Sequence, residues 1–377
     1  TVITCAPNVP DGKVYPGYSN RLWQQESLDG IKVIRVWTYL APNKGAVRRI
    51  INYLSYFLAA GIAGLFAPRP DLLVATSPQF FCGLIGMLLA QVRRLPRVLE
   101  IRDIWPESIQ VVGAMKKSPI TRMLEWVELY MYRAADRIVT VGDGYRDRLS
   151  ERGVPLEKMQ VITNGADLNF YTPGSGDPAF REKYQLAGKF VAAYVGTIGM
   201  ASGLQVALEA SRQLTREGEE DFRLLLVGDG AQREELEQQA CREDLQHLVF
   251  TGRLDKSAIP ALLRSVDICF IHLKQSDLFK TVLPSKLFEA FAVGRAVILG
   301  VDGNARKVLE EAQAGLFVEP GNAPALIDAL KQMRDKPEMR ANFEQNGLKH
   351  VRAFYDRDKL AVDYINFLSA VLNDSKK

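Results

Sequence analysis

Short runs of β-branched and other apolar residues alternate along the whole chain with segments in which apolar positions recur every three or four residues. The short runs predict strands, and the periodic segments predict helices. The expected strands are residues 31–36, 72–75, 98–101, 137–141, 160–162, 190–195, 222–227, 248–251, 267–271, 296–299 and 316–318. This alternation is typical of a doubly wound α/β fold with parallel sheets.

A polar run rich in proline and glycine, residues 171–178, interrupts the pattern near the middle of the chain. It cannot continue a helix or a central strand, and 377 residues are too many for one ordinary core. We therefore predict two domains, residues 1–172 and 173–356, with a final periodic helix at 357–373 that completes the first domain. Ligands of such folds bind in a cleft, which we expect between the two domains.

The longest apolar stretch, residues 50–67, is just short of the ~20 residues that a spanning helix needs. We expect a helix buried in the first domain, with a position in a membrane interface as the alternative. Basic residues stand beside apolar runs in the first third of the chain: Arg48, Arg49, Arg93, Arg94, Arg97, Lys116, Lys117 and Arg122. They suit either an anionic membrane surface or an ordinary solvated face.

The remaining composition excludes some classes of protein. A net charge of +4 is small for this length and does not indicate a nucleic-acid-binding protein. The four cysteines lie far apart without a C-x-x-C motif, so we expect reduced core residues in a cytosolic protein. The three histidines share no metal-ligand spacing with them, and we expect no metal.

A glycine-rich loop is the first candidate for a phosphate site. Gly196, Gly199 and Gly203 lie between the strand at 190–195 and a helix, where free N–H groups and the helix dipole favour an anion. Similar turns occur in any doubly wound protein, so this loop alone leaves the question open. A second loop, Gly228-Asp229-Gly230, is better explained as a tight turn in which Asp229 caps a helix.

The most informative segment is residues 280–297. Pro284 and Ser285 predict a helix start, with Ser285 able to cap it. Lys286 in the first turn opposes the helix dipole, so an anion is expected nearby. Glu289 stands on an otherwise apolar helix and needs hydrogen-bond donors, which a ribose diol would supply. Glu289 could equally face solvent or pair with Lys286.

The order of several motifs resembles that of a known family. Residues 153–170, 250–267, 280–297 and 315–322 resemble the ordered motifs of retaining glycosyltransferase family 4. The resemblance implies a GT-B architecture, in which two Rossmann-like domains face a central cleft. It also implies that a loop and a helix N-terminus bind the donor diphosphate while a glutamate binds the ribose. The donor-binding residues by this resemblance are Gly196, Thr197, Gly199, Gly203, Arg253, Lys280, Pro284, Ser285, Lys286, Leu287 and Glu289.

The resemblance also implies a mechanism without a cofactor or a metal. The acceptor hydroxyl attacks from the face that the diphosphate leaves, and the departing phosphate oxygen takes the proton. Arg253 and Lys286 would stabilise the leaving group. Asp103, at the end of the strand at 98–101, would orient the sugar or the acceptor, although it could equally cap the turn before Trp105.

Within the family, residues 101–108 and 284–286 resemble a bacterial surface-polysaccharide subgroup that includes N-acetyl-L-fucosamine transferase-like proteins. This resemblance implies a UDP-sugar donor, such as a UDP-N-acetyl-amino sugar, with a GDP-sugar as the alternative. The acceptor would be a lipid-linked sugar or an oligosaccharide in O-antigen or capsule synthesis. The protein would be cytoplasmic, with peripheral contact to the inner face of the plasma membrane.

Three departures from the family pattern qualify these expectations. Thr281 replaces the first of two family glutamates, and Thr197 and Ser202 stand where a basic pair is usual. We therefore expect Arg253, Lys280 and Lys286 to supply the positive charge. The chain also begins at what looks like the family's second strand, so we expect the natural protein to be longer. The alternatives are an inactive GT-B partner or regulator and, less favoured with three histidines, a nucleotide-sugar 2-epimerase.

Overall fold

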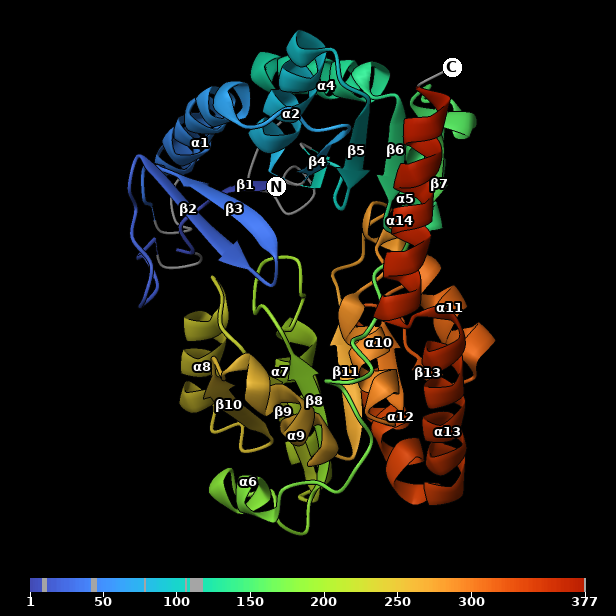
Figure 1. Cartoon of the computed structure of the whole chain (residues 1–377). Coiled ribbons are helices and arrows are strands. Elements are labelled where there is room, and N and C mark those ends of the chain that lie inside the picture. Colours follow the sequence, from blue (N-terminus) through green and yellow to red (C-terminus); the bar gives the residue numbers. More distant parts are fainter. Residues whose placement is uncertain (9–11, 42–45, 78, 106, 109–117, 376–377) are drawn as a thin grey trace. The chain divides into compact units, whose positions relative to one another are not determined.

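The structure is a computed structural model that describes the chain except for residues 9–11, 42–45, 78, 106, 109–117 and 376–377. The chain forms two compact units. Unit 1 comprises Thr1–Val141, Tyr145–Val161 and Asn366–Lys377, and unit 2 comprises Gly142–Gly144 and Ile162–Ile365. In both units helices flank parallel strands, which confirms the predicted α/β class (Figure 1).

Unit 1 contains two sheets. The first has the order β1-β3-β2, in which β1 (Val2–Cys5) runs parallel and β2 (Trp23–Leu28) antiparallel to β3 (Ile31–Val36). The second is parallel throughout, with the order β4-β5-β6-β7. Its strands are β4 (Leu73–Ser77), β5 (Arg97–Ile101), β6 (Arg137–Thr140) and β7 (Met159–Val161). The five strands predicted in this part of the chain are present, whereas the antiparallel β2 was not predicted.

The helices of unit 1 are α1 (Ala46–Phe66), α2 (Phe80–Arg93), α4 (Pro119–Ala134) and α5 (Asp143–Glu151). α4 begins with a capping box, in which Ser118 and Thr121 each accept a hydrogen bond from the other's backbone N–H. α1 is long and apolar enough to cross a membrane by length and composition. The prediction that this stretch is buried is wrong, because only 17% of its most apolar window is buried inside the protein.

Unit 2 is built on one parallel sheet with the order β10-β9-β8-β11-β12-β13. Its strands are β8 (Phe190–Val195), β9 (Phe222–Val227), β10 (Leu248–Gly252), β11 (Ile268–His272), β12 (Val297–Gly300) and β13 (Gly315–Phe317). The side chains of β11 and β12 are buried throughout. Helices cover both faces of such a sheet, so its strands are apolar runs without alternation. This is why the predicted strands match the observed ones to within about two residues.

Two apolar clusters line the two faces of this sheet. Its helices are α6 (Pro178–Lys183), α7 (Gln205–Glu217), α8 (Arg233–Arg242), α9 (Ile259–Arg264), α10 (Ser285–Ala292), α11 (Asn304–Ala312), α12 (Ala323–Asp335) and α13 (Pro337–Phe354). On one face Leu287, Phe288 and Phe291 of α10 pack into the core. On the other face α7 buries Ala207, Leu208 and Leu214, which confirms the helix predicted after the glycine loop.

The last helix, α14 (Arg357–Asp374), begins in unit 2 and ends in unit 1. Its last part lies against β6 and β7, since Phe367 and Val371 line a common pocket with Arg137 and Met159. Val371 is buried there. The predicted linker at residues 171–178 is grouped with unit 2.

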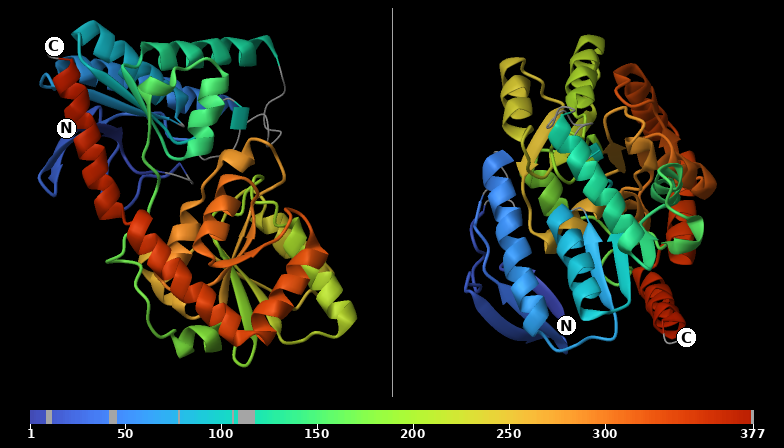
Figure 2. Two further views of the ribbon diagram at one scale, coloured as in Figure 1. Left: turned by 90° about the vertical axis from the view of Figure 1, so that its right-hand side faces the viewer. Right: turned by 90° about the horizontal axis from the view of Figure 1, so that it is seen from above.

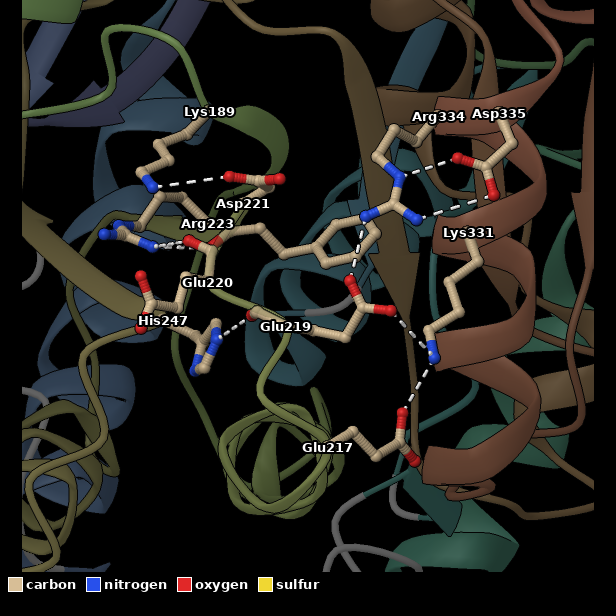
Figure 3. Close-up of polar contacts among 11 residues, drawn as sticks. Lys189, Glu217, Glu219, Glu220, Asp221, Arg223, His247, Lys331, Arg334 and Asp335 are labelled. Carbon is tan, nitrogen blue, oxygen red and sulfur yellow. Dashed lines mark hydrogen bonds and ion pairs between the residues drawn. The ribbon is translucent and has the colours of Figure 1, made fainter.

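An ion-pair network lies next to the start of β9 in unit 2 (Figure 3). Glu219 accepts from Lys331 at 3.2 Å and from Arg334 at 2.9 Å, both on α12. The backbone carbonyl of Glu219 also bonds the Nε2 atom of His247 at 2.6 Å. The network joins the end of α7 to α12, at the edge opposite the carboxyl ends of the strands.

The four cysteines are all free. Cys269 is buried, as predicted for a core residue, and Cys5 and Cys82 are half-buried. Cys241 on α8 is exposed, so the prediction of a core position is wrong for this residue.

Candidate functional site

The donor-binding residues predicted from sequence all belong to unit 2, where they follow the carboxyl ends of β8, β10 and β11. The glycine loop at 196–203 follows β8, Arg253 follows β10, and Lys280 and α10 follow β11. Because all strands of this sheet are parallel, these segments meet at one edge of it. This is the edge at which open α/β sheets bind their ligands.

The loop after β9 is part of this edge. The N–H of Gly196 donates to the carbonyl of Val227 at 2.8 Å, and the N–H of Gly228 donates to that of Gly252 at 3.0 Å. A Cβ on Gly228, which has a φ of 137°, would lie 1.9 Å from the carbonyl oxygen of Gly196. Only glycine therefore permits the close approach of the loops after β8 and β9.

The interpretation of the second loop as a simple helix cap is wrong. The N-cap residue of α8 is Gln232, without a side-chain cap, and Asp229 instead accepts from the N–H of Gly230 at 2.8 Å. The carbonyl of Asp229 also accepts from the N–H of Ile198 at 2.9 Å. Asp229 therefore holds the two loops together.

Lys286 lies directly beside the first glycine loop. Its Nζ atom is 3.9 Å from the ring centroid of Tyr194, and a Cβ on Gly196 would be 2.7 Å from the same atom. The structure thus brings together a lysine and a glycine that the sequence assigned to one diphosphate. A positive charge at this edge, next to bare backbone, is the environment that a phosphate requires.

The start of α10 differs from the prediction in one detail. Pro284 is the N-cap and Ser285 the first helical residue, so Ser285 does not cap the helix. Among the described residues no side chain caps this end of α10. The side chain of Leu287 is fully buried in the core, so a ligand would meet only its backbone. The first turn therefore presents the positive end of the helix dipole together with the charge of Lys286.

Glu289 lies one turn further along α10 and is half-buried. It accepts a hydrogen bond from the hydroxyl group of Tyr171, which is itself buried. Burial raises the pKa of the Glu289 carboxyl, whereas the Tyr171 hydrogen bond and the charge of Lys286 lower it in part. Tyr171 was assigned only to the linker, because nothing local in the sequence marks a contact with a residue more than a hundred positions away.

Lys280 has a different setting. Its ammonium group pairs with exposed Asp277 at 2.9 Å, and it lines a cavity of about 230 Å³ with Lys274 and Arg306. Thr281, at the position of the absent family glutamate, donates to the carbonyl of Leu278 at 2.7 Å and so completes a turn. Arg253 is exposed at the end of β10. Lys286 lies against the glycine loop.

A buried histidine that was not predicted is hydrogen-bonded to the glycine loop at 196–203. His272 at the end of β11 bonds the carbonyl of Ser202 through Nδ1 at 2.8 Å and accepts from the N–H of Gly321 through Nε2 at 2.9 Å. Burial lowers the pKa of His272, which keeps the ring neutral near physiological pH. The hydroxyl group of Ser202 donates to the carbonyl of Gly199 at 2.6 Å, so Ser202 stabilises the loop internally.

Asp103 belongs to unit 1, where it follows β5. Its carboxylate accepts from the hydroxyl group of Ser108 and the N–H of Ile104, and burial raises its pKa. These bonds are those of a cap on the following turn, which was the alternative considered from sequence. The segment around it extends to Pro106, which lies outside the described residues. Its role toward a sugar or an acceptor stays a prediction.

Comparison with known families shows what kind of protein carries this candidate site. Residues 1–165 match the glycosyl transferase 4-like domain, and residues 177–350 match the glycosyl transferases group 1 family. Together the two matches span nearly the whole chain. The protein is a glycosyltransferase.

Similar proteins agree with this assignment. The Escherichia coli K12 protein named colanic acid biosynthesis glycosyl transferase WcaI is 27% identical over 343 residues, which cover 88% of this chain and 83% of that protein. HepE from Anabaena, solved with UDP-glucose, has a TM-score of 0.71 at 20% identity, covering 90% of this chain and 86% of its own. Sucrose-phosphate synthase from Thermosynechococcus elongatus has a TM-score of 0.74 at 17% identity, covering 99% and 88%. These similarities show the GT-B fold of the glycosyltransferase.

The described residues contain no group of three or more histidine, cysteine, aspartate or glutamate side chains that could hold a metal ion. The candidate site consists of Lys286, Glu289, the backbone of the loops after β8 and β9, and the start of α10. The predicted binding roles of its individual residues stay predictions.

Proposed function

We propose that this glycosyltransferase transfers a sugar from a UDP-sugar to a lipid-linked acceptor, with retention of the anomeric configuration, in the synthesis of a bacterial surface polysaccharide. The observation that carries the proposal is the position of Lys286. Its ammonium group lies beside Gly196 at the uncapped start of α10, on the ligand-binding edge of the unit 2 sheet. A lysine, a helix dipole and close backbone together are suited to a diphosphate.

The position of Glu289 supports a nucleotide rather than a simple phosphate. Tyr171 donates one hydrogen bond to its carboxylate, which has about four acceptor positions. The two hydroxyl groups of a ribose could occupy further positions. A carboxylate one turn from the diphosphate site would thus bind the ribose, and the transferred sugar would lie on the far side of the diphosphate.

In the proposed mechanism the chain supplies positioning and charge. Lys286, with Arg253 and Lys280 as further cations, stabilises the negative charge that develops on the departing phosphate. The acceptor hydroxyl attacks the anomeric carbon from the side of the leaving group, and the leaving phosphate oxygen takes its proton. The bond between sugar and phosphate breaks as the new glycosidic bond forms, so no metal or cofactor is required. Asp103 would orient the sugar or the acceptor.

The names of the similar proteins support the substrates. HepE was solved with UDP-glucose, and WcaI is named for colanic acid synthesis. UDP is therefore the preferred nucleotide, and an N-acetyl-amino sugar is the proposed sugar class within the predicted subgroup. An acceptor carried on a lipid places the enzyme on the cytoplasmic face of the membrane as a peripheral protein.

The test is donor turnover. The purified protein is incubated with UDP-glucose, UDP-N-acetylglucosamine or UDP-N-acetylfucosamine and a lipid extract that contains polyprenyl-linked sugars, and UDP release is measured. The proposal predicts release that depends on the extract and a product of retained configuration by NMR. An epimerised nucleotide sugar without UDP release, or a product of inverted configuration, would contradict it. Binding of UDP without any turnover would indicate an inactive relative.

A further inference from the structure

One side of α1 in unit 1 is a continuous row of exposed, large apolar side chains. The row follows the helical period, so its members share one face of the helix. Its members are Val47, Ile50, Ile51, Leu54, Leu58, Ile62, Leu65 and Phe66. Single exposed apolar residues are ordinary, but a row along a 21-residue helix is a patch that calls for a partner.

The other side of α1 packs against the rest of unit 1. The hydroxyl group of Tyr56 donates to the carbonyl of Ile3 in β1 at 3.0 Å, and Ala60 and Ala63 are buried. A Cβ on Gly64 would lie 2.4 Å from a methyl carbon of Leu89 in α2, so glycine allows the two helices to pack closely. α1 is therefore a fixed part of unit 1 that lies on its surface, and only its outer face is available to a membrane.

The exposed row belongs to a wider layer of helices. α2 contacts α1 on one side and α4 on the other, and Figure 2 shows the three helices as one layer. α4 carries a second exposed apolar row of Ile120, Met123 and Trp126. Tryptophan is enriched where proteins meet the interface of a bilayer, because its ring is apolar at one end and polar at the other.

Positive charge surrounds these two rows. The acidic residues of the two helices that carry them are Glu125 and Glu128, both on α4, and Glu128 is buried and pairs with Arg152. The sequence of α1 and that of α2 contain no aspartate or glutamate. The arginines of this layer and its helix ends are Arg48, Arg49, Arg69, Arg93, Arg94, Arg122 and Arg133. Lys116 and Lys117, also noted in the sequence, lie outside the described residues. A protein partner would bind through pockets that hold a few anchor side chains. Rows of aliphatic side chains flanked by arginines are instead suited to the surface of an anionic lipid bilayer.

We infer that the outer face of α1 and α4, the helix layer of unit 1, is a docking surface for a bilayer that contains anionic phospholipid. α1 lies in the plane of the interface with its apolar row at the boundary between headgroups and acyl chains. The flanking arginines bind the anionic headgroups. The inference rests on the surface of unit 1 and not on the proposed donor site in unit 2.

The experiment is co-sedimentation of the whole protein with vesicles, either of pure phosphatidylcholine or of equal parts phosphatidylcholine and phosphatidylglycerol. The wild-type protein is expected to bind the anionic vesicles and to leave the neutral ones largely unbound. The variant Leu58→Ser/Ile62→Ser is expected to bind more than about tenfold more weakly, because two apolar side chains no longer enter the interface. The variants Arg48→Ala and Arg94→Ala should each weaken binding about fivefold.

The matched control is Val362→Ser/Ile365→Ser, which changes two equally exposed apolar residues on α14 in unit 2. It is expected to bind vesicles as the wild-type protein does. Wild-type protein that stays in the supernatant with anionic vesicles would overturn the inference. So would a Leu58→Ser/Ile62→Ser variant that binds normally, or one that instead turns a dimer into a monomer in sedimentation velocity. UDP binding measured without lipid tests the donor site separately.

Discussion

At the scale of single residues, two side chains one turn apart on α10 meet opposite environments. Lys286 lies over the ring of Tyr194 beside bare loop backbone, where its charge could also meet an anion. Glu289 is half-buried against the hydroxyl group of Tyr171, so it keeps its charge at some cost. A partly buried carboxyl group with a raised pKa, one turn from a lysine beside bare backbone, is typical of groups that serve a ligand.

Replacement of Lys286 by alanine tests the diphosphate site. Loss of a charged hydrogen bond to phosphate should weaken UDP binding by about 1.5–3 kcal/mol, or roughly ten- to a hundredfold, in isothermal titration calorimetry. Lys307→Ala is the matched control, because that exposed lysine on α11 has only a 3.9 Å pair with Glu311. Equal affinities of Lys286→Ala and Lys307→Ala would show that Lys286 does not contact the donor.

The substitution Tyr171→Phe tests the role of Glu289 through pH. In the proposed site the ribose would bind the ionised carboxylate, and burial raises the pKa of Glu289 above its ordinary value of 4.5. UDP affinity is therefore lost on acidification at a higher pH than for an ordinary glutamate. Removal of the Tyr171 hydroxyl raises this pKa further, so the loss should begin at still higher pH, with affinity about threefold lower at neutral pH. A pH profile identical to that of the wild-type protein would rule out this coupling.

At the scale of elements, the strands could be predicted because apolar runs of β8, β9, β11 and β12 are buried on both faces. β2 could not, since its sequence Trp-Gln-Gln-Glu-Ser-Leu is polar and it pairs on one side only, with β3. The helix at α1 was predicted, but its burial was not. Periodicity shows which face of a helix is apolar and says nothing of what covers that face.

Site residues could be predicted where spacing within one helix or turn determines their position. They could not be predicted where their position depends on contacts with residues distant in sequence. Lys286 and Glu289 follow from their spacing on one helix, and the glycines after β8 follow from a strand-to-helix turn. Gly228, Tyr171 and His272 act through contacts with residues distant in sequence, such as Gly196, Glu289 and Gly321. No periodicity or local motif reports such contacts.

His272 joins the glycine loop at 196–203 to the loop that contains Gly321, and its replacement by leucine should loosen both loops. The change leaves the carbonyl of Ser202 and the N–H of Gly321 without their side-chain partner, which costs about 1–3 kcal/mol each and should lower the melting temperature by several degrees. His350→Leu is the control, because the Nε2 atom of that ring has no hydrogen-bond partner in the described structure. An equal effect of both changes would contradict the role of His272.

The same bonds predict a dependence of stability on pH. Burial lowers the pKa of His272 below its ordinary value of 6.5, so the folded protein binds this proton less readily than the unfolded chain. The contribution of His272 to stability is therefore complete above that value and is lost as pH falls toward the folded pKa. Melting temperatures of wild-type protein and His272→Leu should converge on acidification.

At the scale of the whole molecule, the two units carry different surfaces. Unit 2 holds the proposed donor site at one edge of a six-stranded sheet, and unit 1 carries Asp103 and an apolar helix layer that is flanked by arginines. This division is the one that an enzyme needs when its donor is dissolved in the cytoplasm and its acceptor is held in a membrane. It allows each half of the account to be tested without the other.

The central claim is that unit 2 binds a uridine nucleotide through Lys286 and Glu289. The most direct test is the melting temperature of the protein with UDP, GDP or dTDP, measured in parallel with Glu289→Ala. UDP at about 100 times its dissociation constant should add about 2.7 kcal/mol and raise the melting temperature by several degrees. The account predicts a shift with UDP that Glu289→Ala loses. No shift with any nucleotide, or the same shift in the variant, would contradict it.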